Sequence, residues 1–207
     1  MDMFGDREVA SKESMVVRKM TVSRCHRDEV VRFIEENHYS GSINGVKTEH
    51  CFALRYEGET IGAMIYAEMA MHNQWKKFGE SKSSVIELRR LCCIDETPKN
   101  TESYFIGKTL RWLKKHTNIA VVVSYADAEY GHTGVIYRAS NFKYHGLSAG
   151  AKVIDWNGKK YHDKTIRTKY KGEIKPFAQK VKEALEGGEA KYCETAGKHT
   201  YTYSLDN

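Results

Sequence analysis

The densest group of chemically capable side chains lies between residues 124 and 142. Asp127 follows a run of β-branched apolar residues, and such a run is typical of a strand that is buried on both faces. Because α/β proteins bind ligands outside the carboxyl ends of such strands, Asp127 is a candidate functional residue. Gly131 and Gly134 favour a tight turn into a short helix, on which the phenol of Tyr137 would face the same region. In the alternative interpretation, Asp127 only caps that helix and Tyr137 packs in the core.

A second candidate is the pair His38 and Tyr39, which follows a predicted helix. An imidazole beside a phenol is suited to act as a base, as a metal ligand or as a platform for a stacked nucleobase. The alternative is a histidine that only lies at the surface near a helix end.

A third candidate is the strand predicted over residues 85–94, which contains two arginines. Regular alternation would place Glu87, Arg89 and Leu91 on one face, and Leu88, Arg90 and Cys92 on the other. One arginine would then face a cleft, or else Glu87 and Arg89 form a surface ion pair of little energetic value.

Several kinds of chemistry are disfavoured by the motifs that the sequence lacks. Its five cysteines contain no CxxC pair, which argues against a zinc ribbon or a disulfide framework, and the adjacent Cys92 and Cys93 are expected to be unreactive buried thiols. The sequence also has no Walker A, GxGxxG, GxSxG or HExxH motif, which argues against P-loop, Rossmann, serine-hydrolase and zincin chemistry.

The elements that must position these residues alternate between strands and helices. We expect strands at residues 15–20, 51–56, 60–67, 85–94, 119–125, 142–147 and 151–156, and helices at residues 24–37, 101–116, 133–140 and 176–186. Ser23 is the expected N-cap of the first helix, and Asn157-Gly158 is typical of a type I′ hairpin turn. This order predicts an α/β fold with a mixed central sheet flanked by helices.

The net charge of +6 is concentrated in one segment of the 207 residues. Residues 151–182 contain ten Lys or Arg and only three Asp or Glu, with aromatic residues between them. Cations for phosphates and rings for stacking indicate a nucleic-acid surface, although a solvated charged face is the alternative. No apolar run approaches the ~18–20 residues that span a bilayer, and no secretory signal is recognisable, so we expect a cytoplasmic protein without membrane contact.

The motifs together resemble a known family. His38-Tyr39-Ser40, the strand Glu87-Leu88-Arg89-Arg90-Leu91, Tyr125-Ala126-Asp127-Ala128, Gly131-His132-Thr133-Gly134, Tyr137 and Asn141-Phe142 carry the resemblance. Over residues 15–165 the chain resembles the Mom family of phage DNA-modification proteins, and its strand order resembles the GCN5-related N-acetyltransferase (GNAT) fold.

The resemblance implies a transferase that adds a methylcarbamoyl (acetamido) or related acyl-type group to N6 of adenine in double-stranded DNA and so protects it from restriction. It implies catalytic roles for His38, Tyr39, Asp127 and Tyr137, with Tyr137 as general acid for the thiolate of coenzyme A (CoA). It further implies an iron ion (Fe²⁺) on His38, Tyr39 and Asp127. A GNAT enzyme that acetylates a protein or small-molecule amine, and a non-catalytic DNA-binding module, are the alternatives.

The same resemblance implies acetyl-CoA or a related donor. The GNAT pyrophosphate motif Q/R-x-x-G-x-G/A is absent, so the expected donor contacts are Arg89, Lys99, Thr101, Ser103 and Tyr137. The expected DNA contacts are Trp156, Lys159, Lys160, Lys164 and Arg167. We expect a flexible lead-in over residues 1–14, a catalytic domain over 15–165, a basic C-terminal extension over 166–207 packed on the same domain, and a homodimer.

Overall fold

The computed structural model describes residues 15–43, 45–71 and 73–205, so the predicted lead-in over residues 1–14 lies outside the described residues. The chain divides into two compact units. The sheet unit contains residues 15–125, 134–145 and 201–205, and the second unit contains residues 126–133 and 146–200. The predicted boundary at residue 165 does not coincide with any boundary between them.

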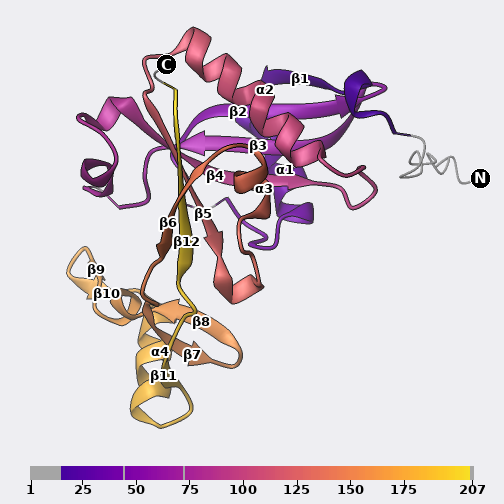
Figure 1. The fold of residues 1–207 in the computed structure, drawn as a ribbon. Helices are drawn as coiled ribbons and strands as arrows, with labels where there is room; N and C mark the ends of the chain where they lie inside the picture. The colour runs from indigo at the N-terminus through magenta and orange to yellow at the C-terminus, as the bar shows by residue number, and fades with distance from the viewer. Residues whose placement is uncertain (1–14, 44, 72, 206–207) are drawn as a thin grey trace, which may run out of the picture. The chain divides into compact units, whose positions relative to one another are not determined.

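A seven-stranded mixed sheet organises the sheet unit, in the order β1-β2-β3-β4-β5-β12-β6 (Figure 1). Its strands are β1 (Thr21–Cys25), β2 (Thr48–Tyr56), β3 (Glu59–Ala67), β4 (Val85–Cys93), β5 (Val121–Asp127), β6 (Lys143–Leu147) and β12 (Lys198–Ser204). The first four strands pair antiparallel, whereas β4 and β5 pair in parallel. The predicted α/β class with a mixed sheet is confirmed.

Two long helices cover opposite faces of this sheet. Helix α1 (Arg27–Asn37) buries Val30 and Ile34 in a cluster that includes Ile65 of β3. The next residue of β3, Tyr66, points to the other face, where its hydroxyl lies 2.7 Å from Thr109 Oγ1 of helix α2 (Thr101–His116). The predicted helix over residues 101–116 is confirmed, because its apolar positions are the ones that are buried.

The N-terminal elements correct two predictions. Residues 15–20 do not form a strand: Val17–Lys19 make a 3₁₀ turn (η1), with Met15 and Met20 buried on either side of it. The first strand is instead the polar β1, which pairs along one side only, at the sheet edge. Ser23 lies inside β1, and His26 caps α1 in its place, in a capping box with Glu29.

The second unit has its own small core. Strands β7 (Lys152–Trp156), β8 (Lys159–His162) and β11 (Lys191–Glu194) form a sheet in the order β11-β7-β8, on which helix α4 (Pro176–Glu186) packs. Ile154 and Val181 are completely buried between them. Asn157 and Gly158 both have positive φ, 51° and 74°, which confirms the predicted hairpin turn.

The end of the chain differs from the predicted extension. After β6 the chain enters the second unit, and it returns to the central sheet as β12, between β5 and β6. Residues 198–204 are therefore an internal strand of the central sheet. The remaining elements are short: η2 (Gln74–Lys77), η3 (Lys82–Ser84), η4 (Ala128–Tyr130), α3 (Val135–Ala139), η5 (Asp163–Ile166), β9 (Lys169–Tyr170) and β10 (Glu173–Ile174). None of the helices within the described ranges has the length and apolar character needed to span a bilayer.

Candidate active site

The central sheet opens between its two parallel strands. Pairing of β4 with β5 runs only from Val85 opposite Val121 to Leu88 opposite Ser124. Beyond Leu88, β4 continues to Cys93 and pairs with β3 alone, within the part of the chain that the structure describes. The N–H and C=O groups on the other edge of β4 can therefore accept an extended ligand that hydrogen-bonds like a short strand.

A β-bulge in β4 marks this opening. Arg90 lies opposite Ile65, whereas the next pair is Leu88 opposite Tyr66, which leaves Arg89 as the extra residue. One extra residue reverses the alternation of side chains along a strand. Glu87 consequently shares a face with Arg90, so the predicted alternation over residues 87–92 is wrong.

The bulge gathers charged groups at the opening. The carboxylate of Glu87, only 6% exposed, accepts hydrogen bonds from the Ala70 amide at 3.1 Å and from Arg89 at 3.3 Å. Arg90 donates to the Ser42 carbonyl at 3.1 and 2.9 Å, and so ties β4 to the loop after α1. Burial lowers the pKa of Arg90, and the charge of Arg89 lowers it further.

That loop carries the predicted pair His38 and Tyr39. The Nδ1 atom of the buried His38 lies 3.1 Å from the Ser40 amide nitrogen, which donates to it, and 2.8 Å from the Ser40 hydroxyl. The His38 and Tyr39 rings lie 4.2 Å apart, and Tyr39 is 47% exposed. The ring of Tyr39 is therefore accessible to a planar ligand, whereas the imidazole of His38 is buried and hydrogen-bonded within its own loop.

Tyr137 sits on α3, as the sequence predicts. Its ring is buried against Tyr201, with ring centroids 5.3 Å apart. The pKa of Tyr137 is raised to about 12, mainly because the phenol is buried. The charges of Tyr39 and Glu87 also raise this pKa, whereas the hydrogen bond with Ser124 lowers it. The phenol stays protonated at neutral pH and is therefore a hydrogen-bond donor. Tyr39 and Glu87 thus act electrostatically on the phenol of Tyr137.

Three participants were absent from the sequence prediction. Ser124 forms a hydrogen bond with Tyr137, and the ring of Tyr201 packs on the ring of Tyr137. Gln74 donates a hydrogen bond to the Tyr125 hydroxyl at 2.7 Å. The charges of Glu87 and Arg89 act on that hydroxyl. Burial raises the pKa of Tyr125 as well. For Tyr201 a signal existed, because the alternating residues 198–204 are typical of a strand. Ser124 and Gln74 are recognisable only once the sheet is assembled.

Asp127 belongs to the second unit and has partners there. Its carboxylate lies 2.9 Å from Lys198 Nζ and accepts the Glu129 amide at 3.1 Å, so that it caps the short turn η4. Within the described residues, no three His, Cys, Asp or Glu side chains converge as metal ligands. The Lys198 ammonium on the Asp127 carboxylate does not fit the iron site that the resemblance implies.

The predicted donor contacts at the start of α2 differ in how accessible they are to a ligand. Lys99 is exposed just before the helix, whereas the Thr101 hydroxyl is fully buried and donates to the Pro98 carbonyl at 2.8 Å. Ser103 donates to the Asn100 carbonyl at 3.0 Å. A pocket of ≈ 250 Å³ lies farther along the helix, between α2, the end of α3 and the end of β12. Its lining includes Ser103, Gly107, Arg111, Lys114, Ser140 and Asn141.

The predicted DNA contacts of the second unit are partly engaged elsewhere. Trp156 is half-buried against the α4 core cluster, Lys160 pairs with Glu129, and Arg167 pairs with Asp163. The Lys159 ammonium lies 5.5 Å from the Tyr161 ring centroid, and the Lys164 carbonyl accepts the backbone amides that close η5. The four basic residues of the predicted set are all exposed, and Lys159 and Lys164 are those without an ion pair among the described residues.

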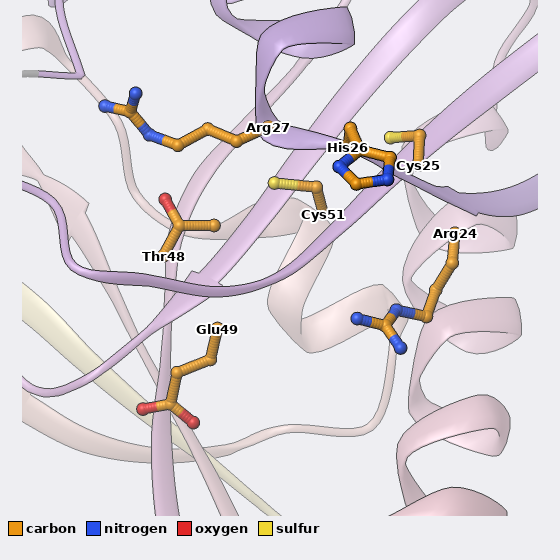
Figure 2. A pocket seen from close by; sticks show the side chains of 7 residues that line it. All are labelled: Arg24, Cys25, His26, Arg27, Thr48, Glu49 and Cys51. Carbon is orange, nitrogen blue, oxygen red and sulfur yellow. The ribbon is translucent and has the colours of Figure 1, made fainter.

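A separate pocket of ≈ 480 Å³ lies where β1 passes into α1 (Figure 2). It is lined by Arg24, Cys25, His26, Arg27, Thr48, Glu49 and Cys51. The Arg24 guanidinium packs 5.1 Å from the Trp112 ring centroid, and burial raises the pKa of Cys25 to about 12 and that of Cys51 to about 11. Burial also raises the pKa of Cys92 to about 12, in agreement with the expected unreactive thiols.

Comparison with known proteins finds one family model, one curated relative and several solved structures of similar fold. The family model described as the Mom protein family matches residues 19–207. The methylcarbamoylase Mom of Escherichia phage Mu is 33% identical over 88 residues, which are 42% of this chain and only 36% of that protein's length. The fold is similar to a putative acetyltransferase of Salmonella typhimurium with its cofactor acetyl-CoA, at a TM-score of 0.53 and 7% identity over 91% of this chain and 95% of that one. It is also similar to a Vibrio cholerae spermidine N-acetyltransferase, at a TM-score of 0.51 and 10% identity over 91% and 96%. These likenesses confirm the GNAT-like fold.

Proposed function

Because the chain belongs to the Mom protein family, we propose that it is a transferase that places a methylcarbamoyl or related acyl-type group on N6 of adenine in DNA and thereby protects the DNA from restriction. The observation that carries this proposal is the opening between β4 and β5, with the buried phenol of Tyr137 beside it. An open strand edge suits an extended donor, and a phenol that stays protonated suits its leaving group.

The donor in this proposal is acetyl-CoA or a related thioester, since a solved protein of similar fold contains acetyl-CoA. Its amide-containing arm would pair with the free edge of β4 after Leu88. Its phosphates would lie at the positive N-terminal end of α2 near Lys99, and along the pocket that Arg111 and Lys114 line. The buried hydroxyl of Thr101 would support the turn before α2, because it is already bonded to Pro98.

The acceptor would lie on the other side of the opening. Adenine must leave the base stack before its N6 is accessible, and a flipped base needs an aromatic platform. The exposed ring of Tyr39, held by its contact with His38, provides such a platform.

The proposed step conserves atoms and charge. For the acyl-type product, N6 attacks the carbonyl carbon of the thioester, and the carbon–sulfur bond breaks as the new carbon–nitrogen bond forms, which gives N6-acyladenine. Attack on a thioester carbonyl does not by itself yield the methylcarbamoyl group, which is attached through a methylene carbon. Tyr137 donates its hydroxyl hydrogen toward the departing sulfur, while the proton lost from N6 passes to Glu87, the buried carboxylate that acts on Tyr137 electrostatically. A role for Asp127 remains a prediction.

Nucleoside analysis tests the proposal. DNA from cells that express the chain is digested, and its deoxyadenosine is examined by mass spectrometry beside DNA from cells that express Tyr137→Phe. We expect a modified deoxyadenosine with the wild-type chain and a strongly reduced amount with the variant, whereas Tyr144→Phe, an exposed tyrosine of β6, serves as the matched control. Unmodified deoxyadenosine, with acetyl-CoA consumed on a protein or polyamine instead, would overturn the DNA target and favour an ordinary N-acetyltransferase.

A further inference from the structure

An exposed β-hairpin projects from the second unit without a role in its core. Strands β9 and β10 pair Tyr170 with Glu173 and Lys169 with Ile174, around a two-residue turn. The turn residues Lys171 and Gly172 have φ of 52° and 87°, as a tight type I′ turn requires. Every residue from 167 to 173 is exposed, so the sequence of this hairpin is not explained by packing.

The hairpin presents an aromatic ring among cations. Tyr170 is 62% exposed, and the ammonium groups of Lys171 and Lys175 lie 5.8 and 5.5 Å from its ring centroid. Lys169 precedes the ring in the same strand. An exposed tyrosine beside cations is a combination that recurs where proteins contact nucleic acids, because the ring stacks on bases while the cations meet phosphates.

Some basic residues of the unit already have acidic partners, whereas these lysines have none within the described ranges. Lys160, Lys182 and Lys198 each pair with an acidic side chain. Among the residues that the structure describes, no ion pair is formed by Lys169, Lys171 or Lys175. Their charge is therefore not neutralised within the second unit and is available to an anionic partner.

We propose that the β9–β10 hairpin is the element through which the chain binds duplex DNA, with Lys169, Lys171 and Lys175 on the phosphates and the Tyr170 ring against the bases. A two-stranded ribbon is one of the two elements that the major groove admits. The inference rests on the proposed function for its choice of DNA as the partner. The proposed DNA contact therefore lies at residues 169–175. Trp156, Lys160 and Arg167, which were expected to contact DNA, already have partners inside the unit.

The contribution of the Tyr170 ring is tested by binding of the full chain to a fluorescent 20-base-pair duplex. Binding is followed by fluorescence anisotropy over a range of NaCl concentrations. In a duplex the ring contacts base edges in the groove. Loss of one such contact by Tyr170→Ala should weaken binding about 5-fold, equivalent to ~1 kcal/mol. Tyr170→Phe keeps the ring and should bind within about twofold of wild type. Equal affinity of Tyr170→Ala and wild type would overturn the role of the ring.

The lysines are tested by the salt dependence of the same binding. Each lost phosphate contact reduces the slope of log K against log salt by ~0.9, so the triple change of Lys169, Lys171 and Lys175 to Ala should reduce it by about 2.7. The matched control changes three lysines of the sheet unit, Lys47, Lys76 and Lys77, to Ala and should leave the slope near that of wild type. Equal slopes for the two triple variants, or a preference for single-stranded over duplex DNA, would overturn the hairpin as the duplex-binding element.

These measurements are independent of catalysis, because no donor is present. If wild type binds duplex DNA through the hairpin but modifies no deoxyadenosine, the proposed function fails and the inference stands. If deoxyadenosine is modified but the hairpin variants bind and modify DNA as wild type does, the inference fails alone. Unchanged far-UV circular dichroism and melting temperature are expected for all variants, since the altered side chains are exposed.

Discussion

Removal of one oxygen atom from Tyr137 separates a chemical role from a packing role. Tyr137→Phe keeps the ring that packs between Tyr201 and Phe142, with centroid distances of 5.3 and 5.5 Å. It removes the hydroxyl that bonds Ser124 and that we place beside the leaving sulfur. The Ser124 hydroxyl keeps a second acceptor, the Leu88 carbonyl at 3.4 Å, so we expect a loss of only about 1 kcal/mol in folding stability.

The expected loss of rate follows from the pKa of the phenol. With its pKa raised to about 12, Tyr137 is a weaker acid than a thiol, whose pKa is ~8.5. Complete proton transfer to the sulfur is therefore uphill, and the contribution expected is that of a hydrogen bond to a developing charge, ~1.5–3 kcal/mol. Tyr137→Phe should lower the rate of the chemical step about 10- to 150-fold, less than the most effective general acids contribute.

Single-turnover measurements with purified protein, an adenine-containing oligonucleotide and acetyl-CoA as the donor probe report that step directly. The Tyr137-dependent part of the rate should be unchanged from pH 7 to pH 9.5, since the phenol ionises only near pH 12. The same shift affects stability. In the unfolded chain the phenol ionises near pH 10, so the stabilisation that favours the neutral form is complete below pH 10 and is lost as the pH rises toward 12, up to about 3 kcal/mol.

Three results would refute this reasoning. A rate within twofold of wild type would mean that Tyr137 only packs. A loss of 10⁴-fold or more would mean that it transfers its proton completely, and hence that its pKa in the reacting complex is far below 12. An alkaline decline in unfolding free energy that is the same in wild type and Tyr137→Phe would contradict the raised pKa itself.

Two further pairs of substitutions test the packing and the hydrogen bonding around the site. Gly134→Ala places a methyl group 2.3 Å from the Tyr201 ring at a φ of 73°, so we expect a loss of about 2–5 kcal/mol in urea unfolding. Gly131→Ala has nearly the same φ with open space around it and should cost only ~1–2 kcal/mol; equal losses would show that the ring contact has no effect. Thr109→Val leaves the fully buried Tyr66 hydroxyl without its partner at 2.7 Å and should cost about 1–3 kcal/mol. Tyr66→Phe in the same chain should recover part of that loss, and strict additivity in the double variant would contradict a coupled pair.

Local patterns in the sequence were sufficient for the regular elements. Pro98 and Asn100 precede the helix over residues 101–116, and its apolar spacing matches the face that packs on β3. The run over residues 15–20 was misleading, because its two methionines are buried at either end of a 3₁₀ turn, as they also would be in a strand. The true first strand is polar, since an edge strand has less apolar contact to make.

The site was only partly accessible from the sequence. Tyr137 was predicted from its place on the short helix after a buried strand, whereas Glu87 was noted only for its place in the strand over residues 85–94. The bulge at Arg89 was not, because it depends on the register between β3 and β4 and not on any residue type in β4. Asp127 was read as a site residue from its place after a buried strand, yet the ion pair with Lys198 depends on a strand more than seventy residues later.

The place of β12 in the sheet has a consequence for how the protein is made. This strand lies between β5 and β6, but it is synthesised after both of them and after the whole second unit. At ~5–20 residues per second, a ribosome takes on the order of 3–10 s to pass from the end of β6 to the start of β12. During that interval β5 and β6 each expose an unpaired edge, and the β12 segment of a neighbouring copy could fill the same position. Early release or truncation before residue 198 would therefore leave not a smaller enzyme but an open sheet prone to strand exchange and aggregation.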